Sequence, residues 1–106
     1  MHRAYYSVIK SFADAVTADI LAGRQTKANR QAHAIWAVAR RKLQLLDTAR
    51  DLADLRVPPG NRLEPLAGRR AGQHSIRVND QFRLCFVWTP DGPAEVEFVD
   101  YHDERR

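Results

Sequence analysis

Arginine is the residue type in this sequence that points most clearly to chemistry. Of the 17 basic residues, 14 are Arg and only Lys10, Lys27 and Lys42 are Lys. A guanidinium group is a planar fork that binds phosphate through two parallel hydrogen bonds, so this bias suits a polyanionic partner. A GC-rich genome and an ordinary solvated surface explain the same bias equally well. Composition alone therefore leaves both interpretations open.

The positive charge is concentrated in the middle of the chain. The formal net charge is +4, but residues 24–56 carry eight basic and three acidic side chains and residues 57–89 carry five and two. Residues 90–106 carry two basic and six acidic side chains. A polyanion is therefore expected to meet the segment between residues 24 and 83.

Short elements are expected before the first arginines of this segment. Residues 5–9 (YYSVI) are aromatic and β-branched and predict a strand. Ser11 and Asp14 form a capping pair for a helix over residues 13–22, which Gly23 ends.

The arginines at 30, 40 and 41 are expected on a longer helix. From about Lys27 to Leu46, apolar residues recur three, four and seven positions apart, which is one face of an amphipathic helix. Asp47-Thr48 is expected to cap a second helix, with Leu52 and Leu55 facing inward, and Val57-Pro58-Pro59-Gly60 ends it. The basic face of the longer helix consists of Arg30, Arg40, Arg41 and Lys42.

The hydrophobic period then changes from that of a helix to that of a strand. Residues 73–78, 82–88 and 94–99 alternate, and residues 89–93 (TPDGP) form a turn. A three-residue loop at residues 79–81, with Asn79 or Asp80 left-handed, keeps one face of the first hairpin apolar. The sequence thus predicts one α+β domain over residues 1–106, with N-terminal helices packed on an antiparallel sheet.

This hairpin register brings two arginines together. It places Arg77 opposite Arg83 on the face away from the core, beside Gln73, Ser75 and Cys85, with no acid expected near the pair. Like charges directly across a strand pair are destabilising. The two side chains either splay into water or converge on a phosphate, and we favour the phosphate because such a cost is often tolerated at functional sites.

Other chemistries lack their signatures. The sequence has no phosphate-loop, dinucleotide, HExxH or CxxC motif, and its four His residues show no ligand spacing, so neither a metal nor a cofactor is expected. Cys85 is expected to be a small buried side chain, and Trp36 and Trp88 to belong to the core. With one cysteine, no membrane-length apolar run and no signal peptide, a cytoplasmic domain is expected.

Two stretches resemble a known family. Residues 63–86 (LEPLAGRRAGQHSIRVNDQFRLCF) and residues 96–102 (VEFVDYH) resemble the HigB-type toxins of bacterial toxin–antitoxin pairs, within the RelE superfamily. Residues 9–12 (IKSF) and the helical residues 39–64 also look like this family, so the resemblance covers residues 8–102 and leaves residues 1–7 and 103–106 as extensions. It implies a RelE-like α+β fold, a ribosome-dependent endoribonuclease that cuts mRNA in the ribosomal A site without a metal, and a helix-turn-helix antitoxin as partner.

The resemblance also implies site residues. The arginine that stabilises the phosphate in the family falls on Arg83, and the C-terminal family motif falls on Asp100, Tyr101 and His102. RNA cleavage needs a base, an acid and positive charge on the phosphorane; His102 titrates in the right range, and Tyr101 is able to stack on a base. The residues expected to bind RNA are Arg69, Arg70, Arg77, Arg40, Arg41 and Lys42.

The sequence departs from the family pattern in the segment before the first hairpin. Glu64 and Ala67 stand where some members carry a catalytic His and Lys, so a two-base arrangement copied from those members cannot operate unchanged. Glu64 is either a base or an ion-pair partner of nearby arginines. Two other functions stay open: a ParE-like toxin that poisons a topoisomerase, and a non-catalytic module that binds RNA or the ribosome.

Overall fold

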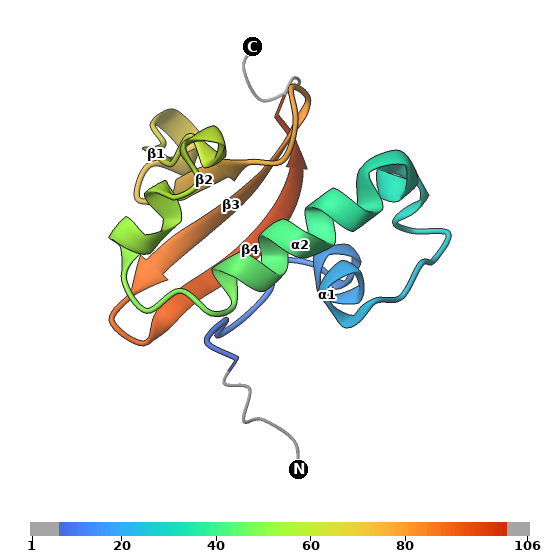
Figure 1. Cartoon of the computed structure of the whole chain (residues 1–106), viewed down its shortest axis with the longest axis horizontal. Helices are drawn as coiled ribbons and strands as arrows, with labels where there is room; N and C mark the ends of the chain where they lie inside the picture. The colour runs from blue at the N-terminus through green and yellow to red at the C-terminus, as the bar shows by residue number, and fades with distance from the viewer. Residues whose placement is uncertain (1–6, 102–106) are drawn as a thin grey trace.

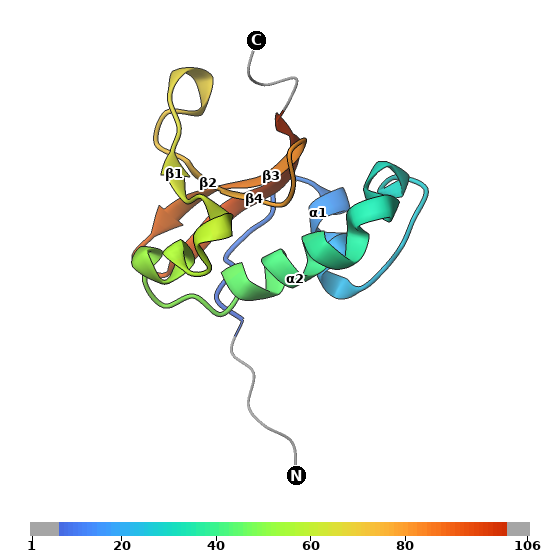
Figure 2. The ribbon, with the colours of Figure 1, turned by 45° about the horizontal axis from the view of Figure 1, so that its top comes forward.

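A four-stranded antiparallel sheet carries both α-helices on one face (Figures 1 and 2). This computed structural model describes residues 7–101, without the side chain of Gln31. The predicted α+β class is confirmed. The helices are α1 (Ala15–Ala22) and α2 (Trp36–Leu46), and the strands, in sheet order, are β1 (Glu64–Pro65), β2 (His74–Arg77), β3 (Phe82–Thr89) and β4 (Gly92–Asp100).

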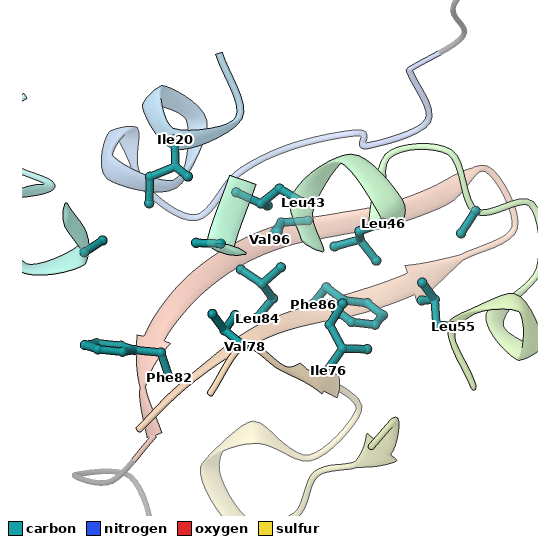
Figure 3. Packing of buried hydrophobic residues seen from close by; sticks show 13 residues of the cluster. Ile20, Leu43, Leu46, Leu55, Ile76, Val78, Phe82, Leu84, Phe86 and Val96 are labelled. Carbon is teal, nitrogen blue, oxygen red and sulfur yellow. The ribbon is translucent and has the colours of Figure 1, made fainter. Parts of the chain in front are cut away.

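The core lies between the helices and the sheet (Figure 3). Period-two alternation turns Ile76, Leu84 and Phe86 toward the helices, where they meet Leu43 and Leu46 of α2. All five side chains are fully buried. Trp36 and Trp88 pack against this cluster, as predicted. Within residues 7–101, no helix has the length and apolar character that crossing a membrane requires.

Helix α1 begins two residues later than predicted, because Asp14 alone caps it. The Asp14 carboxylate accepts a hydrogen bond from the Thr17 amide at 2.8 Å. Ser11 is not part of the cap; its hydroxyl accepts from the Glu95 amide at 2.9 Å. Gly23 ends the helix in the left-handed conformation, with φ of 86°, as predicted.

The amphipathic helix predicted from Lys27 begins later than predicted, and a tighter helical turn precedes it. A 3₁₀ helix, η1 (Arg30–Ile35), leads into α2. Asn29 is buried and exchanges hydrogen bonds with Thr26, and this local pairing holds the chain in a turn before η1.

The predicted second helix is a 3₁₀ turn, and its cap is not Asp47. This element, η2 (Leu52–Arg56), is capped by Asp51, and Leu55 is buried as predicted. Asp47 is instead the C-cap residue of α2. Its buried carboxylate accepts hydrogen bonds from the Ser7 hydroxyl and from the amides of Val8 and Ile9 at 2.6, 3.1 and 2.9 Å.

These bonds replace the strand predicted over residues 5–9. Residues 7–9 form no strand because Asp47 takes their hydrogen bonds, and residues 5 and 6 lie outside the described residues. The following residues run along β4, where Lys10 donates to Pro93 at 2.8 Å and Ala13 to Val96 at 2.9 Å. This segment protects an otherwise open sheet edge.

The register of the first hairpin is confirmed, but its loop conformation is not the predicted one. Ile76 pairs with Leu84 and Arg77 with Arg83. Neither Asn79 nor Asp80 is left-handed. The Asn79 side chain instead accepts from the amides of residues 81 and 82 at 2.9 and 2.7 Å, which closes the loop without positive φ. The second hairpin is tighter than predicted, since Thr89 pairs with Gly92.

A bulge sets which side chains of β4 share a face with Arg83. The β3–β4 register shifts between Cys85 and Val87, next to Glu95, which has φ of 53°. Beyond the bulge, Asp100 pairs with Phe82. Alternation therefore places Asp100 on the helix-covered face and Tyr101 on the opposite face.

Candidate active site

Arg83 is buried, contrary to the picture of two solvated arginines. Only 5% of the residue is exposed. Its Nε donates to the Ser75 hydroxyl at 2.7 Å, and its Nη2 donates to the main-chain carbonyl of Arg62 at 2.7 Å. A Glu64 carboxylate oxygen lies 3.8 Å from the same Nη2. Acids also reach the arginine pair, because Arg77 forms an ion pair with Asp80. The expectation of no nearby acid is therefore wrong.

A small pocket opens beside the Arg83 guanidinium. Its volume is about 200 Å³. Tyr101 follows the end of β4, and its ring lies over the guanidinium, with 5.4 Å from the Arg83 Cζ to the ring centroid. Tyr101 is fixed at this place by its amide, which donates to the Gln81 carbonyl at 2.8 Å. We call this the arginine pocket; its lining residues are Arg62, Arg77, Asn79, Asp80, Arg83 and Tyr101.

The electrostatics of the arginine pocket favour an anion. Among the described residues that line it, three are Arg, and the one acidic residue, Asp80, is already paired with Arg77. A guanidinium held by fixed dipoles next to an aromatic face is the kind of site that binds a phosphate flanked by a base. This arrangement is able to stabilise negative charge that develops on a phosphorus centre.

The loop that holds the Arg62 carbonyl is anchored from inside. Asn61 ends a 3₁₀ turn, η3 (Pro59–Asn61), and is fully buried. Its amide group donates to the carbonyls of Leu55 and Val57 at 3.1 and 3.2 Å, and its side-chain oxygen accepts from the Lys42 ammonium. Arg62 itself is left-handed, with φ of 47°.

Two of the four predicted catalytic residues meet in this pocket. Arg83 and Tyr101 lie together. Asp100 does not join them: it faces the helices, where its carboxylate accepts from the Gln81 side chain at 3.0 Å. His102, the next residue after Tyr101, lies outside the described residues.

The six residues predicted to bind RNA are dispersed. Arg77 lines the arginine pocket. Arg69 and Arg70 belong to η4 (Gly68–Arg70), in the loop between β1 and β2 that rises on the side of the sheet away from the helices (Figure 2). Arg69 is exposed, whereas Arg70 forms an ion pair with Glu97 at 3.2 Å.

The helical members of the six lie elsewhere. Arg41 is exposed on α2. Arg40 instead joins the two helices, because its Nε donates to the Leu21 carbonyl at 3.1 Å. Lys42 is turned inward to Asn61. Burial, and then the positive charges of Arg41 and Arg77, lower the pKa of the Lys42 ammonium.

Sequence reasoning missed part of the machinery around Arg83. Arg62 and Asn61 lie in residues 39–64, a stretch that also resembles the family, but the sequence assigns neither of them a role at the site. The hairpin register predicts Ser75 beside Arg83, but it does not predict the hydrogen bond between them. The ion-pair interpretation of Glu64 agrees with its distance from Arg83.

The chain matches a known class of protein over most of its length. The family model for the RelE-like toxin of type II toxin–antitoxin system HigB matches residues 10–102. The chain therefore belongs to the HigB-like family of RelE-like toxins.

Two curated proteins are similar to this chain over part of its length. Toxin HigB-1 of Vibrio cholerae is 53% identical over 62 residues, which is 58% of this chain and 64% of that protein. An uncharacterized protein of Haemophilus influenzae is 40% identical over 54 residues, which is 51% of this chain and 54% of that protein. The chain thus spans somewhat more than half the length of the curated relatives it matches.

Proposed function

We propose that this chain is the toxin of a type II toxin–antitoxin pair and that it cleaves mRNA on the 70S ribosome, in the A site. Family membership supports the toxin role. The observation that carries the nuclease activity is the arginine pocket, where Arg83 is buried, anchored and placed beside the ring of Tyr101. A ribosomal substrate places this activity in the cytoplasm.

The proposed reaction is an internal transesterification. The ribose 2′-oxygen attacks the adjacent phosphorus and loses its proton, and the 5′-oxygen of the next nucleotide leaves with a proton. Arg83, with Arg77 beside it, supplies the positive charge on the phosphorane, so the proposal needs no metal ion or cofactor. His102 is proposed to transfer a proton, and Tyr101 to hold a base.

The decisive variant is Arg83→Ala. Because the guanidinium is proposed to act on charge that grows in the transition state, the variant should lower kcat by roughly 100- to 1000-fold. Primer extension on a reporter mRNA with purified programmed ribosomes measures the rate. His102→Ala should also slow cleavage, but less completely, since water is able to take part of the proton transfer. Cleavage by Arg83→Ala at the wild-type rate would remove Arg83 from the active site.

Pulse labelling in cells separates the proposed activity from its main rival. Expression of the wild-type chain should stop incorporation of amino acids before incorporation of thymidine. Selective loss of DNA synthesis would instead support a toxin that acts on a topoisomerase.

The proposed partner in the cell is a helix-turn-helix antitoxin with acidic groups that complement the basic helical surface around Arg41. Co-expression with the product of the adjacent gene, followed by a pull-down, tests this partner. Toxicity that no neighbouring gene suppresses would contradict it.

A further inference from the structure

We propose that Ser75 and the main-chain carbonyl of Arg62 are positioning groups for cleavage, because they hold the Arg83 guanidinium in the orientation that meets the phosphorane. This inference rests on the proposed nuclease function and adds two positioning residues to it. We do not expect the Ser75 hydroxyl or the Arg62 carbonyl to contact the RNA.

The two hydrogen bonds fix the plane of the guanidinium. They leave from different nitrogens, Nε and Nη2, and both are 2.7 Å long. Their acceptors come from different elements, Ser75 from β2 and Arg62 from the residue after η3. A planar group bound at two separated nitrogens cannot rotate about its long side chain without breaking one bond.

Both acceptors are neutral. A hydroxyl and a carbonyl orient the guanidinium, and these two hydrogen bonds do not neutralise its positive charge. Preorganised charge of this kind stabilises a transition state without reorganisation during the reaction. Misplacement of a reacting or stabilising group by about 1 Å costs on the order of 100-fold in rate.

The Arg62 carbonyl is directed at Arg83 by a backbone conformation that non-glycine residues rarely adopt. Arg62 has φ of 47° and ψ of 54°. Such a residue persists where its surroundings over-determine it. Here the preceding residue, Asn61, is fully buried and bonded to the Leu55 and Val57 carbonyls and to Lys42. The contacts of Asn61 therefore offset the conformational free-energy cost of the left-handed Arg62 and keep the Arg62 carbonyl in place.

A matched pair of variants tests the Arg62 carbonyl. Arg62→Gly and Arg62→Val both remove the charged side chain, but glycine adopts the left-handed conformation freely and valine resists it. We expect kcat for Arg62→Val to be at least about tenfold below that of Arg62→Gly, with KM for programmed ribosomes changed equally in both. Equal kcat values for the two folded variants would overturn the role of the carbonyl.

Ser75→Ala tests the other acceptor by removing a single oxygen atom. We expect kcat to fall on the order of 10- to 100-fold while KM stays within about twofold, because the RNA-binding surface is untouched. A purely structural role for Ser75 would lower the melting temperature and leave kcat per folded molecule unchanged. Wild-type kcat for Ser75→Ala overturns the role of Ser75, and if Arg62→Val fails to fold, Arg62→Ala replaces it in the comparison with Arg62→Gly.

Arg83→Ala in the same assay separates this inference from the function on which it rests. Loss of cleavage in Arg83→Ala, together with wild-type kcat in Ser75→Ala and equal kcat in the Arg62 pair, rejects only the positioning roles. Wild-type cleavage by Arg83→Ala rejects the active site itself.

Discussion

At the scale of single residues, Arg83 shows how a buried cation is held by neutral hydrogen-bond acceptors. Removing a charge from water is costly unless hydrogen bonds compensate for the lost solvation. Ser75 and Arg62 supply part of that compensation from neutral oxygens, while Glu64, the charged neighbour, lies at 3.8 Å and is 47% exposed in its side chain. The two 2.7 Å hydrogen bonds of Arg83 thus go to dipoles rather than to a charge.

Tyr101 should contribute through its ring to substrate binding. Tyr101→Ala removes the face that lies over Arg83 and should raise KM for programmed ribosomes about tenfold, the order expected for loss of one stacked base. Tyr101→Phe keeps the ring and should leave KM within about twofold of wild type. Steady-state cleavage over a range of ribosome concentrations measures both. A phenylalanine variant as weakly bound as the alanine variant would show that the hydroxyl, and not the ring, holds the substrate.

The lowered pKa of Lys42 should make the free energy of unfolding increase as the pH rises in the alkaline range. Its pKa in the folded chain lies below the ordinary 10.5, so between these two values the unfolded chain binds more protons. The free energy of unfolding should therefore increase with pH just below 10.5, and Lys42→Gln should lack this increase. Urea unfolding of both proteins from about pH 8 to about pH 10 measures the difference. Parallel pH profiles for the two proteins would contradict the shift.

At the scale of elements, the second hairpin and the N-terminal segment depend on one glycine. Gly92 has φ of 130°, and a Cβ atom at this position would lie 2.2 Å from the Val8 carbonyl oxygen. Gly92→Ala should lower the free energy of unfolding by at least about 2 kcal/mol. Gly60→Ala is the matched control, because a Cβ there meets no atom within 4 Å, and it should change stability by less than about 0.5 kcal/mol. Equal melting temperatures for the two variants would contradict the close approach.

The elements that sequence could predict are those set by local rules. The apolar pattern and the Arg77–Arg83 register follow from keeping one sheet face apolar, and both are confirmed. The loss of the strand expected at residues 5–9 and the pairing of the short β1 depend on which distant group takes a hydrogen bond, as Asp47 does for Val8 and Ile9. In the candidate site the same division holds: the position of Arg83 is predictable, and its hydrogen bond to the Arg62 carbonyl, 21 residues away, is not.

At the scale of the whole molecule, exposed positive charge lies on two sides. Arg69 stands on the loop that rises from the same side of the sheet as the arginine pocket, and Arg41 stands on α2, which covers the opposite face (Figure 2). A polyanion bound in the arginine pocket would therefore lie on the same side of the sheet as Arg69. A protein bound to the helices meets Arg41 instead.

Charge reversal at these two positions should separate the two proposed partners. Arg69→Glu should weaken binding to programmed ribosomes and flatten its dependence on salt, since one lost phosphate contact reduces the logarithmic salt slope by about 1. Arg41→Glu should leave that slope unchanged and slow association with an acidic antitoxin, because rim charges act mainly on the association rate. Filter binding to ribosomes at several salt concentrations and surface plasmon resonance with the co-expressed antitoxin measure the two effects. If both variants lose ribosome binding equally, RNA contacts the helices as well, and the antitoxin must then compete with the ribosome for the same surface.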